Sequence, residues 1–146
     1  VSTVYKIGKN IFFDVSSIAW LFEYPNSFTI WIAIDKATKK NGSVEYLLGS
    51  HKRLYPHTAL FAPGSSQKVK EINKLKNKFK IKSFNLNPGD CLIHHSQIIH
   101  GSKKNSSNYS RKGFTVQVMT STSKVDKEKF KKYQESLKKQ IELRAT

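Results

Sequence analysis

The alternation of hydrophobic and polar residues predicts four β-strands in this chain. Residues 28–34 follow a period of two, which places successive side chains on opposite faces of a strand. One face carries Phe28, Ile30, Ile32 and Ile34, and the other carries Thr29, Trp31 and Ala33. Residues 44–48, 91–95 and 113–119 show the same kind of pattern and are predicted to be strands as well.

Turn residues separate these segments. Asn41-Gly42 indicates a tight turn that needs a positive φ, and Gly49 indicates a similar bend. Asn87-Pro88-Gly89-Asp90 is typical of a turn that leads into the third strand. Residues 64–84 are rich in lysine, asparagine and serine, and we expect them to form a long loop or insertion.

From Ser123 the hydrophobic period changes to three and four residues. The apolar positions are Phe130, Tyr133, Leu137 and Ile141. This spacing predicts an amphipathic helix over about residues 124–142, with Ser123 or Asp126 as its N-terminal cap.

Short strands followed by one helix predict an all-β barrel or jelly roll. We expect a β core over residues 1–122 and a C-terminal helix over 123–146 that packs on the outside of the barrel. A chain of 146 residues, 38% of them hydrophobic, has the size and composition of one globular domain. It has no apolar run of the roughly 18 residues that a membrane span needs. Cys91 is the only cysteine, which fits the cytoplasmic location that we expect.

The net charge of +16 is large for a chain of this length. Lysine and arginine are concentrated in residues 68–82 and 124–144. A basic surface can bind nucleic acid or anionic lipid, or attract an anionic substrate. Neither stretch interleaves aromatic residues with arginine as a base-stacking surface does. Solvated basic faces are therefore the favoured interpretation, and a nucleic-acid partner is not expected.

His100 and Arg111 are the residues with the clearest chemical potential. A histidine near the end of one strand can bind iron through a ring nitrogen. An arginine eleven residues later, at the start of the next strand, can hold a carboxylate through two parallel hydrogen bonds. The spacing alone is weak evidence, because single histidines and arginines are usually structural or surface residues.

Four sequence blocks around this pair resemble those of the phytanoyl-CoA dioxygenase family. The first block runs from Trp31 to Ser43 (WIAIDKATKKNGS), and the second runs from Leu48 to Lys52 (LGSHK). The third is Pro88-Gly89-Asp90, and the fourth runs from Ile98 to Arg111. Because the blocks follow the family's order over roughly residues 11–119, the resemblance is specific.

The resemblance implies a double-stranded β-helix that holds Fe(II) through two histidines and one carboxylate. It also implies 2-oxoglutarate and O₂ as co-substrates, and hydroxylation of an unknown small molecule. Carried over by position, His100 is an iron ligand, and Asp14 falls where the carboxylate of the family's His-x-Asp motif belongs. Arg111 corresponds to the arginine that pairs with 2-oxoglutarate, and Ser102 and Trp31 match positions that line the co-substrate pocket.

The chain departs from the family at the first iron ligand. The motif requires a histidine at position 12, and this chain reads Phe12-Phe13-Asp14. No histidine precedes His51, so a small shift of register cannot supply one. The loss of one ligand of three should weaken iron binding sharply. Because the chain opens on Val1, only about a dozen residues before Asp14, we expect an N-terminally truncated member of the family.

The other histidines and the cysteine favour structural interpretations. His94 and His95 are adjacent on a predicted strand, so only one can face a pocket, and a core position is the simpler interpretation for both. His51 belongs to the Gly-Ser-His block, and His57 lies in an expected loop. Cys91 lies on a predicted strand and is interpreted as a core residue.

Three functions stay open. The favoured one is an iron- and 2-oxoglutarate-dependent oxygenase that lacks one metal ligand. The second is a pseudoenzyme of the same family that binds a ligand without turnover. The third is a basic module that binds nucleic acid or an anionic surface. The sequence predicts neither the substrate nor the oligomeric state.

Overall fold

The structure of the chain is a computed structural model that describes two long stretches and several short ones. The described residues are 11–14, of which the backbone is described, and 27–56, 69–121, 123–128, 130–131, 134–135 and 142.

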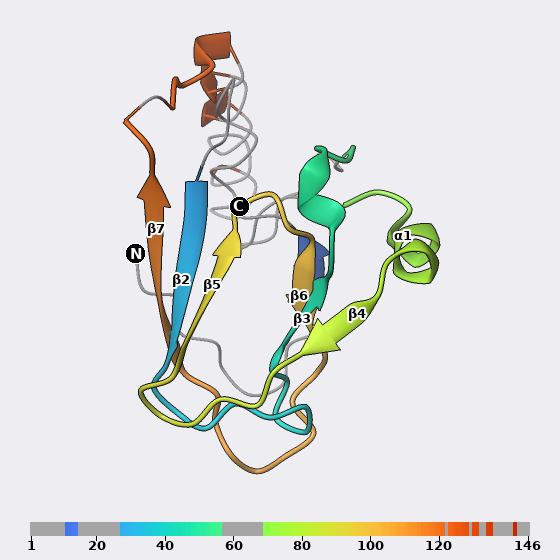
Figure 1. Ribbon diagram of the computed structural model, residues 1–146, viewed down its shortest axis with the longest axis vertical. Helices are drawn as coiled ribbons and strands as arrows, with labels where there is room; N and C mark the ends of the chain where they lie inside the picture. The colour runs from blue at the N-terminus through green and yellow to red at the C-terminus, as the bar shows by residue number, and fades with distance from the viewer. Residues whose placement is uncertain are drawn as a thin grey trace.

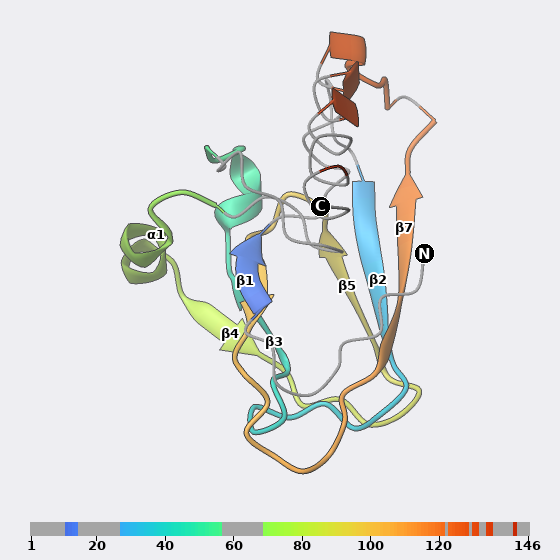
Figure 2. The same cartoon turned by 180° about the vertical axis from the view of Figure 1, so that it is seen from behind.

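Two antiparallel sheets face each other (Figure 1). The three-stranded sheet has the order β5-β2-β7 and consists of β2 (Ser27–Ala33), β5 (Cys91–His95) and β7 (Gly113–Met119). The four-stranded sheet has the order β1-β6-β3-β4 and consists of β1 (Ile11–Asp14), β3 (Val44–Leu47), β4 (Ile81–Ser83) and β6 (His100–Ser102). Figure 2, which shows the molecule from behind, has β1 in front of the four-stranded sheet, where it pairs with β6. Two short helices, η1 (Ser50–Lys52) and α1 (Ile72–Lys78), lie next to the four-stranded sheet.

The three-stranded sheet directs its more polar face inward. Thr29 pairs with His94 on one side and Gln117 on the other, and Trp31 pairs with Leu92 and Thr115. Ser27, Thr29, Trp31 and Ala33 are all buried. The alternation along residues 28–34 is therefore confirmed, and the face that carries Trp31 is the one that faces the second sheet.

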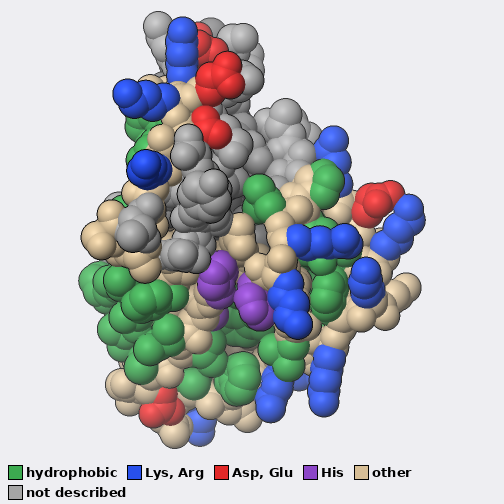
Figure 3. Space-filling model, turned by 45° about the horizontal axis from the view of Figure 1, so that its top comes forward, with side chains coloured by type: hydrophobic (Ala, Val, Ile, Leu, Met, Phe, Trp, Pro, Cys, Tyr) green, Lys and Arg blue, Asp and Glu red, His purple; other side chains and the backbone are tan. Residues whose placement is uncertain are grey.

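The opposite face of this sheet is apolar and meets solvent. Three rows cross it, His95–Phe28–Val118, Ile93–Ile30–Val116 and Cys91–Ile32–Phe114. Ile93 is 61% exposed and Phe114 is 41% exposed. We call the eight residues of these rows other than His95 the apolar outer face, because the ring of His95 lies beside that of His51. Figure 3 shows hydrophobic side chains gathered on this side of the molecule. Cys91 is exposed on this face, so its interpretation as a core residue was wrong.

A second hydrophobic cluster backs the four-stranded sheet. It consists of Leu47, Tyr55, Val69, Leu75 and Ile99, with Ile72 and Phe79 packed against it. Leu47 and Ile99 are fully buried, and the Leu47 N–H donates a hydrogen bond to the Ile99 carbonyl. This cluster fixes β3 beside β6 and leaves the other face of both strands free to form a site.

The expectation that residues 64–84 form a loop was wrong for the described part of that segment. Ile72–Lys78 form α1, and Ile81–Ser83 form β4. Ile72, Leu75 and Phe79 are spaced three and four apart and pack on the second cluster. Most of the other residues of this segment are lysine or asparagine, so its three apolar positions were not recognised as one face of a helix.

The other expected elements agree with the structure as far as it describes them. The four predicted strands are present as β2, β3, β5 and β7. Gly42 and Gly49 have φ values of 83° and 87°, which confirms both predicted turns. The C-terminal helix and its packing stay predictions, because the apolar positions Tyr133, Leu137 and Ile141 lie outside the described residues.

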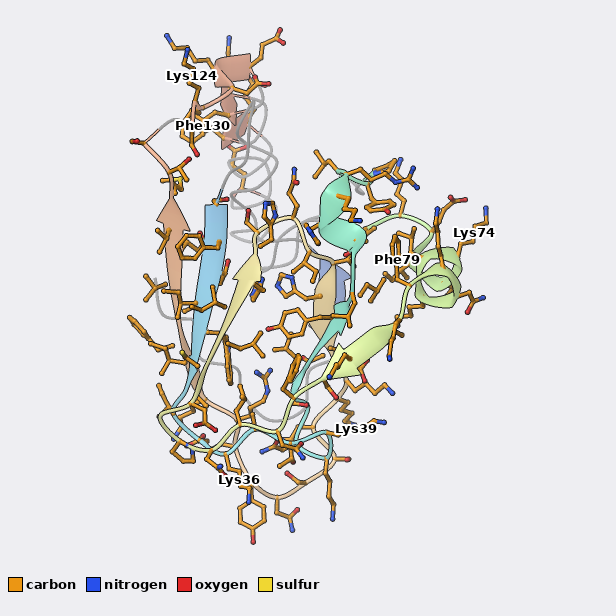
Figure 4. The ribbon with its side chains drawn as sticks, in the orientation of Figure 1. Lys36, Lys39, Lys74, Phe79, Lys124 and Phe130 are labelled. Atoms are coloured by element: carbon orange, nitrogen blue, oxygen red, sulfur yellow. The ribbon has the colours of Figure 1, made fainter. Side chains whose placement is uncertain are left out.

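Four lysines that Figure 4 labels lie at the periphery of the described molecule. Lys36, Lys39, Lys74 and Lys124 point away from the space between the sheets (Figure 4). No helix within the described ranges is both long and apolar enough to cross a membrane.

Candidate functional site

Two histidines and a tyrosine meet in the space between the sheets. The rings of His94 and His100 lie 4.9 Å apart, measured between their centroids. The Tyr46 ring lies 5.0 Å from His94 and 5.9 Å from His100, and it is stacked on the latter at 24°. His94 and Tyr46 are buried, and His100 is partly buried. We call His94 and His100 the histidine pair.

The strand registers place these rings. Tyr46 of β3 lies opposite His100 of β6, so both side chains emerge from the same face of the four-stranded sheet. His94 of β5 lies opposite Thr29 of β2, on the inner face of the three-stranded sheet. The histidine pair therefore has one member on each sheet.

Backbone carbonyls fix the tautomer of both histidines. The Nδ1 of His94 lies 3.2 Å from the carbonyl oxygen of His95, and the Nδ1 of His100 lies 2.9 Å from that of Ile98. A carbonyl oxygen only accepts, so Nδ1 must carry the proton in each ring. In the neutral ring, Nε2 then keeps its lone pair, which is the form in which a histidine binds a metal.

Burial keeps the histidine pair neutral. It lowers the pKa of His94 to about 3, and the charge of a protonated His100 would lower this pKa as well. Burial also lowers the pKa of His100. The hydrogen bond to the Ile98 carbonyl acts in the opposite direction, but the effect of burial is larger. Burial raises the pKa of Tyr46 above its usual range, and the charge of Arg111 acts in the opposite direction. Tyr46 therefore stays a neutral phenol between the histidine pair and Arg111.

Asp14 lies directly across from His100. The two residues are Cα partners in the antiparallel pairing of β1 with β6, and Ile11 is the partner of Ser102. The register shifts by one residue between these two pairs. The expected proximity of Asp14 and His100 is thus present in the backbone. The side chains of Phe12 and Asp14 lie outside the described part of the structure.

Arg111 and Trp31 form the other end of the site. Arg111 is 5% exposed, and its guanidinium carbon lies 5.6 Å from the centroid of the Trp31 ring. Gly113 lies under that ring, because a Cβ at this position would come within 2.2 Å of Trp31 Cζ2. Arg111 precedes β7 by two residues rather than starting it, and His100 begins β6 rather than ending a strand.

Ser102 supplies a buried hydroxyl to the same inner face. It lies opposite Val44 on β3, and its Oγ has no hydrogen-bond partner among the described residues. A cavity of about 10 Å³ opens nearby, with room for about one water molecule. Its lining consists of Trp31, Ala37, Ser43, Val44, Tyr46, Phe84, Leu86 and Leu92.

Sequence reasoning missed Tyr46, and it interpreted His94 as a core residue. His94 is buried, as expected, but its ring lies beside His100. His95 faces the other way, where its ring lies 5.5 Å from that of His51, and its Nδ1 accepts the Gln97 N–H at 3.1 Å. The alternation along the two strands was the signal that could have grouped these residues by face. Tyr46 and Val44 share a face, as do His94 and Leu92, but the sequence does not say which face is inside.

The side chains that the structure describes bring together no set of three potential metal ligands. The histidine pair supplies two. His57 lies outside the described residues.

Comparisons with known proteins agree on one family. The family model of phytanoyl-CoA dioxygenase (PhyH) matches residues 11–113. A phytanoyl-CoA dioxygenase domain-containing protein 1 homolog from Caenorhabditis elegans is 28% identical over 96 residues, which cover 62% of this chain and 33% of the relative. The chain thus spans about a third of the length of the curated relatives that it matches.

Solved structures share the fold at low identity. The epimerase SnoN in complex with Fe³⁺, α-ketoglutarate and nogalamycin RO has a TM-score of 0.63 and 18% identity, over 85% of this chain and 48% of SnoN. EctD from S. alaskensis in its apo form has a TM-score of 0.65 and 16% identity, over 82% of this chain and 42% of EctD. These similarities support the predicted jelly-roll core.

Proposed function

Because the chain belongs to the phytanoyl-CoA dioxygenase family, we propose that it forms part of an Fe(II)/2-oxoglutarate-dependent oxygenase that hydroxylates a small molecule. The observation that carries this proposal is the placement of His100. Its Nδ1 donates to a backbone carbonyl, so Nε2 carries the lone pair that can bind a metal, and Asp14 is its Cα partner on β1. SnoN, which has a similar fold, was solved with Fe³⁺ and α-ketoglutarate.

His100 and Asp14 supply donor atoms of the two kinds that a divalent iron site uses. Iron in this class of oxygenase takes nitrogen from histidines and oxygen from one carboxylate. In our proposal His100 provides nitrogen and Asp14 provides oxygen. The hydrogen bond from His100 Nδ1 to the Ile98 carbonyl orients the ring, as the outer partners of metal-binding histidines do.

Arg111 and Ser102 would hold 2-oxoglutarate. A buried guanidinium can bind a carboxylate through two parallel hydrogen bonds, and Trp31 restricts its movement. The Ser102 hydroxyl can donate one further hydrogen bond. Since the cavity beside Trp31 holds about one water, the lining side chains must rearrange when the co-substrate binds.

With iron, 2-oxoglutarate and O₂ bound, such a site supplies oxidative decarboxylation to succinate and C–H hydroxylation. The protein's own part is positioning. The Tyr46 ring packs against both histidines and keeps water from that side of the site. Its raised pKa keeps the phenol protonated, so it adds no negative charge there.

A pseudoenzyme of the same fold is the second candidate, and Phe12 is the observation that favours it. A phenylalanine has no lone pair to give a metal, so the family's first ligand is lost at this position. Such a protein would still bind a carboxylate ligand at Arg111, but it would produce no succinate.

Anaerobic Fe(II) titration and a succinate assay separate the two candidates. For an oxygenase we expect iron-dependent succinate formation by the wild type, loss of iron binding in His100→Ala, and loss of 2-oxoglutarate binding in Arg111→Ala. Lys112→Ala is the matched control, because Lys112 is adjacent but exposed. Iron binding that is unchanged in His100→Ala would refute the proposed site.

A further inference from the structure

The iron site as carried over from the family has one donor too few. Asp14 and His100 supply two protein ligands, and Phe12 supplies none. A site of two histidines and one carboxylate needs one more imidazole within reach of the same metal. Among the described histidines, His94 is the one whose ring contacts His100.

The separation of the histidine pair matches that of two imidazoles on one metal. A metal–nitrogen distance of about 2.0–2.1 Å, with ligands about 90–110° apart, places two ring centroids about 4.5–5.2 Å apart. The observed separation is 4.9 Å, and the rings are tilted by 51°. Rings that merely pack can also reach this distance, so the protonation of their nitrogen atoms decides whether they can share a metal.

Both rings have the tautomer that metal binding requires. Each Nδ1 donates to a backbone carbonyl, which leaves the lone pair on Nε2. His95 has the opposite arrangement, because its Nδ1 accepts a hydrogen bond from Gln97 and the proton therefore lies on Nε2. The Nε2 of His94 therefore carries a lone pair that can bind a metal, whereas the Nε2 of His95 carries a proton.

We propose that His94 replaces the ligand missing at position 12, so that Asp14, His94 and His100 together hold the iron. This inference rests on the proposed function, and it assigns the third ligand to β5 rather than to β1. A metal held in this way links the three-stranded sheet, through His94, to the four-stranded sheet, through His100. Metal binding should therefore raise the temperature of unfolding.

The first test measures Co(II) affinity by calorimetry, with Co(II) as a stable substitute for Fe(II). We expect His94→Phe to weaken binding by about 100-fold and to abolish the metal-induced rise in unfolding temperature. Phenylalanine preserves the packing of position 94 against Tyr46. His95→Phe is the matched control, and we expect it to leave Co(II) affinity unchanged.

The second test counts the ligands. In the Co(II) protein, the Nδ1 protons of metal-bound histidines give paramagnetically shifted signals in proton NMR. We expect two such signals in the wild type and one in His94→Phe. Two signals in His94→Phe, or unchanged Co(II) affinity, would overturn the assignment of His94 while leaving the proposed function intact.

The third test moves the histidine back to the family position. The double variant His94→Phe/Phe12→His should regain most of the Co(II) affinity that His94→Phe loses. If the wild type binds no Co(II) and Phe12→His alone does, the assignment of His94 is wrong and the family site is restored. If no variant binds Co(II), the proposed function itself fails.

Discussion

The Asp35 carboxylate accepts a hydrogen bond from the Ser110 hydroxyl at 2.6 Å. The same oxygen, Oδ2, accepts the backbone N–H of Lys112 at 2.9 Å. Asp35 follows the end of β2, whereas Ser110 and Lys112 are the two neighbours of Arg111 in the chain. One carboxylate oxygen therefore ties both sides of Arg111 to the sheet that carries Trp31.

We predict that Asp35→Ala weakens 2-oxoglutarate binding although Asp35 need not touch the co-substrate. Without these two hydrogen bonds the backbone around Arg111 keeps the N–H groups of Ile34 and Asp35 on the Lys112 carbonyl but loses its contacts with the carboxylate, and we expect the dissociation constant to rise about 10-fold. Asp35→Asn keeps one acceptor oxygen and should recover part of the affinity. Calorimetric titration of 2-oxoglutarate into the metal-loaded protein measures both. An unchanged constant in Asp35→Ala would mean that Arg111 is held by other contacts.

The same carboxylate predicts a dependence of stability on pH. The hydrogen bond from Ser110, then that from Lys112, lower the pKa of Asp35 below its ordinary value of 3.8. A group whose pKa is lowered by folding stabilises the native state above its unfolded pKa and loses that contribution as the pH falls through the folded value. The free-energy difference between wild type and Asp35→Asn should be constant near neutral pH and shrink below pH 3.8. Urea unfolding at several pH values measures it.

Arg111→Lys should not preserve the function of Arg111. A lysine keeps the positive charge but cannot form two parallel hydrogen bonds with a carboxylate. We expect affinity for 2-oxoglutarate to fall about 10-fold in Arg111→Lys and about 100-fold in Arg111→Ala. Equal affinity in wild type and Arg111→Lys would show that charge alone is recognised.

Gly113→Ala should disturb the co-substrate end of the site through packing. The new methyl group would overlap the Trp31 ring, which must then move away from Arg111. We expect a loss of about 1–3 kcal/mol in the free energy of unfolding. Thermal unfolding measures the loss. The control is Thr115→Ala, because Thr115 lies on β7 like Gly113 and pairs with Trp31 of β2. A stable Gly113→Ala protein with normal 2-oxoglutarate affinity would contradict the prediction.

Phe12→His in the wild-type background should raise iron affinity and the succinate formed without substrate. It adds a nitrogen donor at the position where the family has its first ligand. If His94 already completes the site, the gain should be small, about 10-fold or less. A much larger gain would indicate that wild-type iron is held by two protein ligands.

The sequence predicted β2, β3, β5 and β7 from their alternation, but it missed β1, β4 and β6, which have only three or four residues each and are too short to show a period. It did not predict which face of β2 is buried. The more apolar face, with Phe28 and Ile30, lies outside, whereas the face with Thr29 and Trp31 lines the site. A pattern of alternation reports the period but not the side on which a second sheet packs.

The site was only partly predictable for a related reason. His100 and Arg111 were proposed from their spacing and the family resemblance, and their roles stay predictions. The register of β1 with β6 places the backbone of Asp14 across from His100. The proximity of His94 to His100 arises between two different sheets, so no local motif records it. The sequence alone does not single out His94 as a metal ligand. His95 is the same residue type at the next position of β5, and the sequence does not tell which of the two faces the second sheet.

The apolar outer face determines how copies of this chain should meet in solution. At 0.01 M salt the Debye length is about 30 Å, so the net charge of +16 repels copies before these faces can touch. At 0.15 M salt it is about 8 Å, and the short-range attraction between apolar surfaces is then no longer masked. The protein should therefore behave as a charge-stabilised colloid, whose second virial coefficient falls from positive toward negative values as electrolyte is added.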